Sequence, residues 1–504
     1  MFEKLLMICI FVAITIGVGI YCRKKSTNVG DFVLGGREVG PWLTAFAYGT
    51  SYFSAVVFVG YAGQFGWNFG VAAAWIGIGN AIIGSLLAWV VLGRRTRIMT
   101  KHLESATMPE FFSKRFHSKT VKIVASFIIF IFLVPYSASV YKGLSGLFSM
   151  SFGISFNYCI IGVALLTAIY VIAGGYTATA LNDFIQGLIM IVGICAVIYS
   201  VLNGQGGFMG AMEKLSQIPC ETTPDLNGAF VSIFGPDPLG LLGVVILTSL
   251  GTWGLPQMVH KFYTIKNEKA IKTGTVISTV FALIIAGGSY FIGSFGKLYY
   301  TPAGDTVAFD EVVPAMLGNA LPDLLIGIVL ILVLSASMST LSSLVITSSS
   351  TITLDFIGGF KKDMSPKTQV VMIKVLCGLF VILSAVIAMN PTNLITTLMS
   401  ISWGALAGSF LGPLLYGLFW KGTTKASVWA SFVVGIGITV LNFFHPFAAP
   451  TMAGAIAIMS SLIVVPLVSL VTPKMERALV DEMFVCYDET VTVAQKLVLE
   501  EEGK

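Results

Sequence analysis

A run of hydroxyl side chains inside an apolar stretch is the feature of this sequence best suited to hold an ion. From Leu334 to Ser350 the chain reads LSASMSTLSSLVITSSS. Small residues recur there at helical spacing and would line one helix face with oxygens: Ala336, Ser339, Thr340, Ser343 and Thr347. Neutral oxygens can replace the water shell of a hard monovalent cation. Membrane hydroxyls also bond their own helix carbonyls or allow close packing, and spacing alone leaves both interpretations open.

Two other apolar stretches carry helix-breaking residues at their centres. One reads AYGTSYFS from Ala47 to Ser54, and the other reads SLGTWGLPQ from Ser249 to Gln257. Broken helices at membrane depth are tolerated where the freed backbone lines a cavity or is buried in protein. Such a pair at corresponding positions of two halves indicates an inverted-repeat transporter with its site near the midplane. The alternative for either break alone is that Gly and Pro are common in membrane helices.

Asp183 is the carboxylate that stands near an otherwise apolar run beginning at Asn182. A carboxylate within the membrane is costly and is therefore a functional hypothesis by default. An equally good interpretation places it in the first turn of a helix, where the helix dipole favours it. The sequence leaves both open.

Membrane helices must position these residues, because the composition excludes an ordinary soluble domain. Of 504 residues, 56% are apolar and 11% are charged, against roughly 25% charged in soluble domains, and the mean hydropathy is +0.87. Windows of about 20 apolar residues predict about thirteen spans. They lie near residues 4–22, 41–63, 71–93, 120–142, 155–173, 180–202, 236–259, 271–296, 321–357, 366–390, 393–420, 425–444 and 451–472.

Basic residues gather in alternate connections between these spans, which predicts the orientation. The basic set is Arg23, Lys24, Lys25, Arg37, Arg94, Arg95, Arg97, Lys101, Lys114, Arg115, Lys119, Lys261, Lys266, Lys269, Lys272, Lys361, Lys362, Lys367, Lys421 and Lys425. The other connections hold almost only Lys214 and Lys297. The positive-inside rule then places the C-terminus in the cytoplasm and the N-terminus outside a plasma membrane. Basic residues in short clusters, rather than along one face, do not indicate a nucleic-acid partner.

No catalytic constellation is visible in the sequence. The histidines are scattered at predicted helix ends: His102, His117, His260 and His445. The seven cysteines show no disulfide or metal-site spacing. We therefore expect neither an enzyme nor an organic cofactor, and the sequence does not indicate an oligomeric state.

Three segments together resemble the sodium:solute symporter family, in particular its proline, pantothenate and sialic acid branches. They read LGGREVGPW from Leu34, GGYTATALNDFIQG from Gly174 and SMSTLSS from Ser337, and the similarity runs over nearly the whole chain. The resemblance implies an all-α integral membrane protein with the five-plus-five inverted-repeat core of the leucine-transporter type. Its function would be sodium-coupled import of a small polar solute by alternating access.

The resemblance also implies a division of the chain. Residues 1–40 would form an extra N-terminal helix and a cytoplasmic loop, and residues 41–422 would form the transport core. The halves of that core would be residues 41–202 and 236–422. Two peripheral helices would occupy residues 423–473, followed by a cytoplasmic tail at residues 474–504.

Site residues follow from the same resemblance. The first sodium site would consist of the carbonyls of Thr50, Phe53 and Ala336 and the hydroxyls of Ser339 and Thr340. Some members have a second sodium site, which would map onto Asp183, Ser339, Ser342 and Ser343. The solute pocket would be formed by Ser51, Tyr52, Ser54, Tyr136, Thr252, Trp253 and Pro256.

The solute itself is only loosely indicated, as an amino acid or a carboxylate metabolite. The proline transporters of this family have an aspartate at the position of Tyr52. They have aromatic residues at the positions of Thr248 and Thr252. These differences count against proline. Two other functions remain open: a proton-coupled permease of the same fold with Asp183 as proton carrier, and a membrane sensor that binds a solute without moving it.

Overall fold

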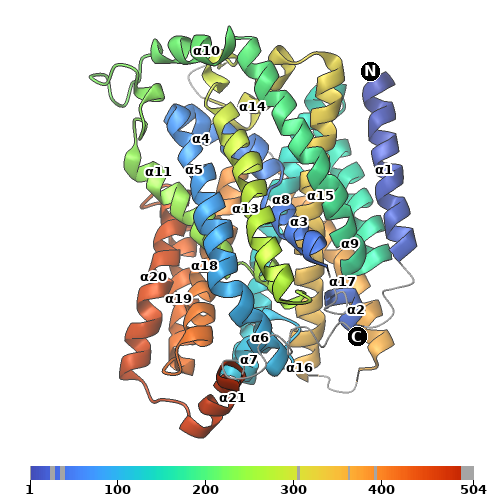
Figure 1. Cartoon of the computed structure of the whole chain (residues 1–504), viewed down its shortest axis with the longest axis vertical. Helices are drawn as coiled ribbons and strands as arrows, with labels where there is room; N and C mark the ends of the chain where they lie inside the picture. The colour runs from blue at the N-terminus through green and yellow to red at the C-terminus, as the bar shows by residue number, and fades with distance from the viewer. Residues whose placement is uncertain are drawn as a thin grey trace.

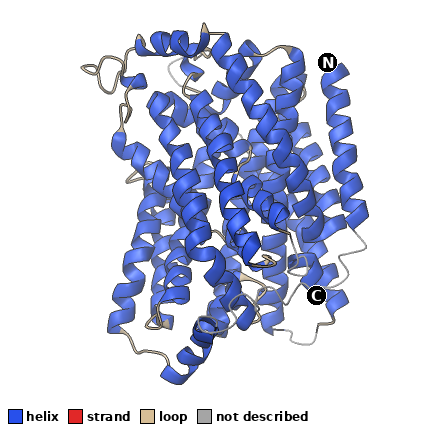
Figure 2. Ribbon diagram, in the orientation of Figure 1, coloured by secondary structure: helices blue, strands red, loops and turns tan. Residues whose placement is uncertain are grey.

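The computed structural model describes residues 2–22, 29–34, 40–302, 307–360, 364–390 and 394–489, and the regular elements in these ranges are helices (Figures 1 and 2). Those of the first half, with η marking 3-10 or π-helical segments, are α1 (Phe2–Cys22), α2 (Val29–Leu34), α3 (Pro41–Tyr52), η3 (Val56–Tyr61), α4 (Ala62–Phe69), η4 (Gly70–Ala73), α5 (Ala74–Gly79), η5 (Asn80–Leu87), η6 (Trp89–Gly93), α6 (Arg94–His102), α7 (Met108–Arg115), α8 (Lys119–Phe152), α9 (Phe156–Asn203), α10 (Gly207–Ser216) and η7 (Ala229–Val231). Those of the second half are α11 (Pro238–Val245), η8 (Ile246–Leu250), η9 (Gly251–Gly254), α12 (Pro256–Tyr263), α13 (Glu268–Gly293), η10 (Gly296–Leu298), α14 (Phe309–Ala320), α15 (Asp323–Thr351), η11 (Ile352–Ile357), α16 (Gly358–Phe360), α17 (Pro366–Ala388), α18 (Ile395–Phe419), α19 (Lys425–Phe444), α20 (Pro450–Val471) and α21 (Arg477–Glu489).

Nine helices in the described ranges are long and apolar enough to cross a bilayer, and the bent pair Pro238–Gly254 and Pro256–Tyr263 makes a tenth span. Shorter apolar helices add Lys4–Val18 and Phe156–Ile169. One of the nine, Val56–His102, has 47 residues and would extend about 70 Å, more than twice the hydrocarbon thickness. Gly70, with a φ of 59°, turns the chain within it, so it supplies the end of the second span and all of the third. Each predicted span therefore falls on helix.

The fifth and sixth predicted spans differ from expectation, because the single helix α9 covers both. A straight helix of its 48 residues would measure about 72 Å. Both of its ends nevertheless lie near α14. Met150, just before α9, is close to Gly318 of α14. The carbonyl of Tyr299 accepts a hydrogen bond from Asn319 of α14, and the Tyr299 hydroxyl donates to the carbonyl of Val201 near the end of α9. The helix therefore reverses between its two apolar halves, as two crossings require.

Both predicted breaks are confirmed. Helix α3 ends at Tyr52, Phe53 is extended with φ −116° and ψ 138°, and helical structure resumes at Val56. In the seventh span Leu255 is extended with φ −80° and ψ 121°, and the helix axis bends by 45° before Pro256 begins α12. Proline fits this first helical position because it has no N–H to leave unpaired.

The third span joins the two broken helices. Its central part, η5, is π-helical, a form that often marks functional positions. The carbonyl of Gly84 accepts hydrogen bonds from the Tyr48 hydroxyl at 2.8 Å and the Thr252 hydroxyl at 3.4 Å. The neighbouring carbonyl of Ile83 accepts from the Trp253 indole at 2.9 Å. One short stretch of η5 thus holds a residue from each break.

Part of the predicted polar tail is packed against the membrane domain. Val480, Met483 and Phe484 of α21 are buried, and their spacing forms one apolar helix face. The guanidinium of Arg95 lies 4.6 Å from the ring centre of Tyr487. Figure 1 places α21 beside α6 and α7, at the opposite end of the molecule from the N-terminus and α10. The rest of the predicted tail, 490–504, lies outside the described residues, as do the basic residues Arg23, Lys24, Lys25, Arg37, Lys361 and Lys362.

Glycine sets the distance between α18 and α19. A Cβ on Gly435 would come within 2.3 Å of the carbonyl carbon of Gly408, whereas a Cβ on Gly437, on the same helix, would meet nothing within 4 Å. Small residues at such contacts let membrane helices approach closely.

We predict that Gly435→Ala lowers the apparent Tm of the purified protein by several degrees, because overpacking a tight contact costs about 1–3 kcal/mol. The matched control, Gly437→Ala, should leave the Tm unchanged or slightly raised, since alanine favours helix. Thermal unfolding in detergent measures both variants. Equal Tm values for the two would contradict the assigned contact.

Candidate functional site

The hydroxyl face of α15 contacts the break of the second span. The Thr340 hydroxyl oxygen lies 3.0 Å from the carbonyl oxygen of Phe53 and 3.1 Å from that of Ala336. The Ser51 carbonyl oxygen is 3.4 Å away. These carbonyls come from both sides of the contact, so Thr340 is the centre of a buried group of neutral oxygens.

Neighbouring hydroxyls extend this group. Ser339 donates to the Thr50 hydroxyl at 2.8 Å, and Thr50 donates to the Phe46 carbonyl at 2.7 Å. Ser337 accepts the backbone N–H of Ala55, just after the break, at 3.1 Å. The structure thus brings together the residues predicted for the first sodium site: Thr50, Phe53, Ala336, Ser339 and Thr340. A cluster of hydroxyl and carbonyl oxygens can coordinate a monovalent cation in place of water.

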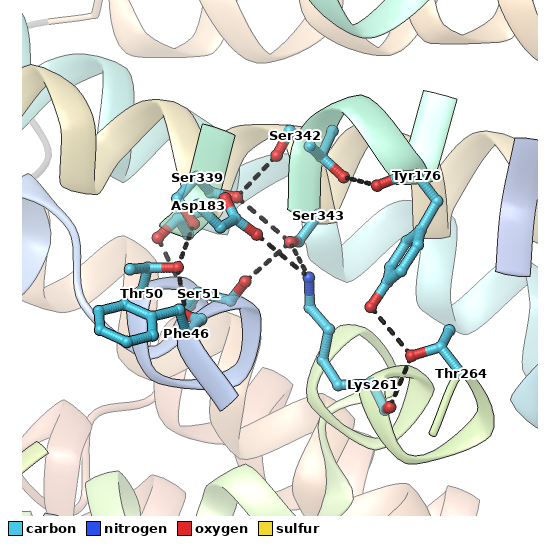
Figure 3. Close-up of polar contacts among 12 residues, drawn as sticks. Phe46, Thr50, Ser51, Tyr176, Asp183, Lys261, Thr264, Ser339, Ser342 and Ser343 are labelled. Atoms are coloured by element: carbon cyan, nitrogen blue, oxygen red, sulfur yellow. Dashed lines mark hydrogen bonds and ion pairs between the residues drawn. The ribbon is translucent and has the colours of Figure 1, made fainter. Parts of the chain in front are cut away.

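A buried ion pair lies beside this group (Figure 3). Lys261 of α12 places its Nζ 3.7 Å from Oδ2 of Asp183 and donates to the Ser343 hydroxyl at 3.0 Å. The Ser343 hydroxyl also lies 2.9 Å from that of Ser51. Asp183 and Lys261 are each 1% exposed. The sequence-based assignment of Lys261 to a solvent-facing basic connection is therefore wrong.

That error has a physical reason. The seventh span continues past its predicted end at residue 259, because α12 restarts after the break and runs to Tyr263. Lys261 therefore lies on a helix that is buried throughout. The available signal was Asp183 itself, since a buried carboxylate needs a positive partner.

Two residues of the predicted second sodium site, Asp183 and Ser343, lie at this pair. Asp183 and Ser343 both lie next to Nζ of Lys261. The hydroxyls of Ser342 and Ser343 also point to the Ser339 carbonyl, at 2.8 and 3.2 Å. Such bonds to a preceding carbonyl are the usual pattern for membrane serines.

The predicted solute pocket is a buried aromatic cluster between the two breaks. The ring of Tyr52 lies 6.4 Å from that of Trp403, which lies 5.8 Å from that of Tyr136. The Tyr52 hydroxyl donates to the Thr248 carbonyl, and Trp253 extends from the second break to η5. Trp403, on α18, was not predicted, because its span is continuous helix and shows no interruption in sequence.

The other predicted pocket residues form the breaks themselves. Ser54 accepts the N–H of Val56 at 3.2 Å, and Thr252 donates to the Ser249 carbonyl at 2.8 Å. Pro256 begins α12, and all of these residues are buried. None of these side chains carries a charge.

Further ion pairs lie toward each end of the molecule. Asp310 of α14 is 4.0 Å from Lys142 and accepts the N–H of Ile395 at 3.3 Å. Burial raises the pKa of the Asp310 carboxyl, and the positive charge of Lys142 opposes that rise. Toward the other end, Asp355 is 3.2 Å from Lys122 and accepts the Thr107 hydroxyl at 2.5 Å. These charges are matched locally.

The sequence and the fold are both similar to those of known transporters. A model of the sodium:solute symporter family matches residues 32–435. Sodium/proline symporters of Staphylococcus aureus are 30% identical over 454 residues, which is 87% of this chain and 85% of theirs. A solved Na⁺-coupled sialic acid symporter aligns with a TM-score of 0.75 at 17% identity, over 95% of this chain and 99% of that one. A nucleobase-cation-symport-1 family transporter in a closed conformation aligns with a TM-score of 0.51 at 16% identity, over 91% and 98%.

The solved structures show the fold: a five-plus-five inverted repeat of the leucine-transporter type. In this chain the breaks lie in the second and the seventh of the predicted spans, at Phe53 and Leu255.

The buried pair gives a stability prediction. Asp183→Asn should destabilise the protein by about 3–5 kcal/mol, because it leaves the Lys261 ammonium buried without a counter-charge. Asp183→Asn combined with Lys261→Met should recover most of that loss. The exposed pair of Lys421 and Asp481, 2.8 Å apart, supplies the control: Asp481→Asn should leave the Tm unchanged. If Asp183→Asn also left the Tm unchanged, the pair would not be formed.

Proposed function

Because this chain belongs to the sodium:solute symporter family, we propose that its sodium ion binds at the break of the second span and that its solute is a small amino acid without net charge. The chain is a multi-pass membrane protein and a sodium-coupled symporter.

The arrangement around Thr340 supports the sodium site. Its hydroxyl oxygen lies within 3.4 Å of three carbonyl oxygens, and two of these belong to the broken helix. Rotation of the hydroxyl proton away from the carbonyls would let the Thr340 oxygen and the carbonyl oxygens each turn a lone pair toward an ion bound between them. Sodium prefers such hard neutral ligands, and carbonyls released at broken helices are their usual source in transporters of this architecture.

Chain connectivity supports coupling between ion and solute. Thr50 and Phe53, proposed to bind sodium, flank Ser51 and Tyr52, proposed to contact the solute. An ion that draws this segment against α15 would order the pocket and raise solute affinity. Linkage then requires the solute to raise sodium affinity by the same factor. The occupied carrier turns inward, which is alternating access.

The charge around the pocket supports a neutral solute. Among the described residues, the fully buried charged side chains near it are Asp183 and Lys261, and they balance each other. A solute with net charge would enter a desolvated site without a counter-ion, which is costly. A zwitterionic amino acid avoids this cost, with its apolar part against the rings of Tyr52, Tyr136 and Trp253. Proline, the solute named for the relatives, is not favoured, because this chain has Tyr52 where the proline transporters of the family have an aspartate.

The proposed orientation makes the cycle an importer. Basic residues on α6 and α7 lie at the end opposite the N-terminus, so the positive-inside rule places the N-terminus outside (Figure 1). One charge moving through about 100 mV yields roughly 2.3 kcal/mol, and a tenfold sodium gradient adds about 1.4 kcal/mol. One ion can therefore accumulate a neutral solute several hundredfold.

Removing the Thr340 hydroxyl tests the sodium site. Thr340→Val should raise the sodium concentration for half-maximal uptake tenfold or more, equivalent to about 1.4 kcal/mol. Ser350→Ala is the matched control, because among the described residues the Ser350 hydroxyl bonds its own helix, at the Thr347 carbonyl. Initial uptake rates at varied sodium measure both. An unchanged sodium requirement in Thr340→Val would move the site elsewhere.

Uptake by proteoliposomes tests the solute. A panel of labelled amino acids, including proline, together with pantothenate, sialic acid and glucose, is offered with an inward sodium gradient and then with potassium instead. We expect sodium-dependent accumulation of a neutral amino acid. Accumulation of a charged metabolite would contradict the neutral-solute proposal. Uptake that follows a pH gradient without sodium would contradict the ion assignment.

A further inference from the structure

Lys261 occupies a position with the properties of a cation site. Its Nζ lies 3.0 Å from the Ser343 hydroxyl oxygen, 3.7 Å from the Asp183 carboxylate and 5.1 Å from the centre of the Tyr176 ring (Figure 3). An anionic oxygen, a neutral oxygen and the face of an aromatic ring are all partners of a monovalent cation. These groups come from α9 and α15, whereas the lysine comes from α12.

The charges in this region allow one cation. Among the described residues, Asp183 and Asp355 are the fully buried carboxylates, and Asp355 is paired with Lys122. The other titratable side chains near Nζ are Tyr176 and, on its own helix, His260. A sodium ion added beside the ammonium would leave one positive charge without a partner. The cost of that charge in a site shielded from water is several kcal/mol.

We propose that the Lys261 ammonium is a tethered cation that takes the place of a second sodium ion at Asp183 and Ser343, so that this transporter moves one sodium per solute. The inference rests on the proposed function for the first ion, at Thr340. It assigns Asp183 a task different from that of a sodium ligand or a proton carrier: the carboxylate neutralises a charge that belongs to the chain.

The Lys261 ammonium is also linked by hydrogen bonds to the proposed solute pocket. Ser343 accepts from Lys261, and its oxygen lies 2.9 Å from that of Ser51 at the first break. A sodium ion at this place would have to arrive and leave in each cycle. The ammonium stays bound to α12, so it holds α12, α15 and α3 together without drawing on the sodium gradient.

Counting bound sodium tests this inference without knowledge of the solute. Equilibrium binding of ²²Na⁺ to the purified full-length protein should give one ion for the wild type. Lys261→Met, which keeps the side chain's length and removes its charge, should gain one ion. Adding Asp183→Asn to Lys261→Met should abolish the gained ion.

The test measures the difference in bound sodium between variants. Failure of the proposed sodium site at Thr340 can therefore be distinguished from failure of the tethered cation. In a Thr340→Val background, Lys261→Met should still gain one ion, whatever the number bound at Thr340. No gain in either background overturns the tethered cation. If Lys261→Met does not fold, the charge-neutral double variant decides: it should bind as many ions as the wild type. Loss of one ion in that double variant would show that the wild type binds sodium at Asp183 and would overturn the inference.

Discussion

The rest of the structure depends on one constraint: backbone groups freed by a broken helix inside a membrane protein must find partners within the protein. Lipid offers none, and each unsatisfied group costs several kcal/mol. Here the partners of the first break are hydroxyls of α15. Thr340 bonds the carbonyl of Phe53, and Ser337 bonds the N–H of Ala55. The break is therefore stable only against this helix face.

The same bonds explain why an ion site can exist at this place. Hydroxyls satisfy either backbone donors or acceptors, and they can turn their oxygen toward a cation without moving the helix. An aliphatic face could not do so, and a charged face would compete with the ion. The neighbouring pair of Asp183 and Lys261 consists of charged groups instead of neutral ones. Each charge there can be buried because the other neutralises it.

Hydropathy windows predicted the spans and Gly and Pro predicted the breaks, since both are local properties of the chain. Hydroxyls at helical spacing must share a face, so the sequence predicted the oxygen-lined side of α15. That Thr50 and Phe53 lie against this face was implied by the family resemblance and not by the spacing. The partner of Asp183 was not predicted, because Lys261 lies 78 residues away and its burial depends on where α12 restarts. Trp403 and the π-helical form of η5 leave no local pattern either. Their roles arise from packing between spans.

The joint contact of η5 with both breaks has a mechanical consequence. Adjacent carbonyls of Ile83 and Gly84 hold Trp253 from one half of the repeat and Tyr48 from the other. The third span lies in the proposed first half together with Tyr48, so a motion that separated the halves would break the bond of Trp253 to Ile83 and leave that of Tyr48 to Gly84. A neutral hydrogen bond contributes only about 1 kcal/mol net, and the gradients acting on one ion supply roughly 3.7 kcal/mol. The free energy available from one ion is therefore larger than the contribution of one such hydrogen bond.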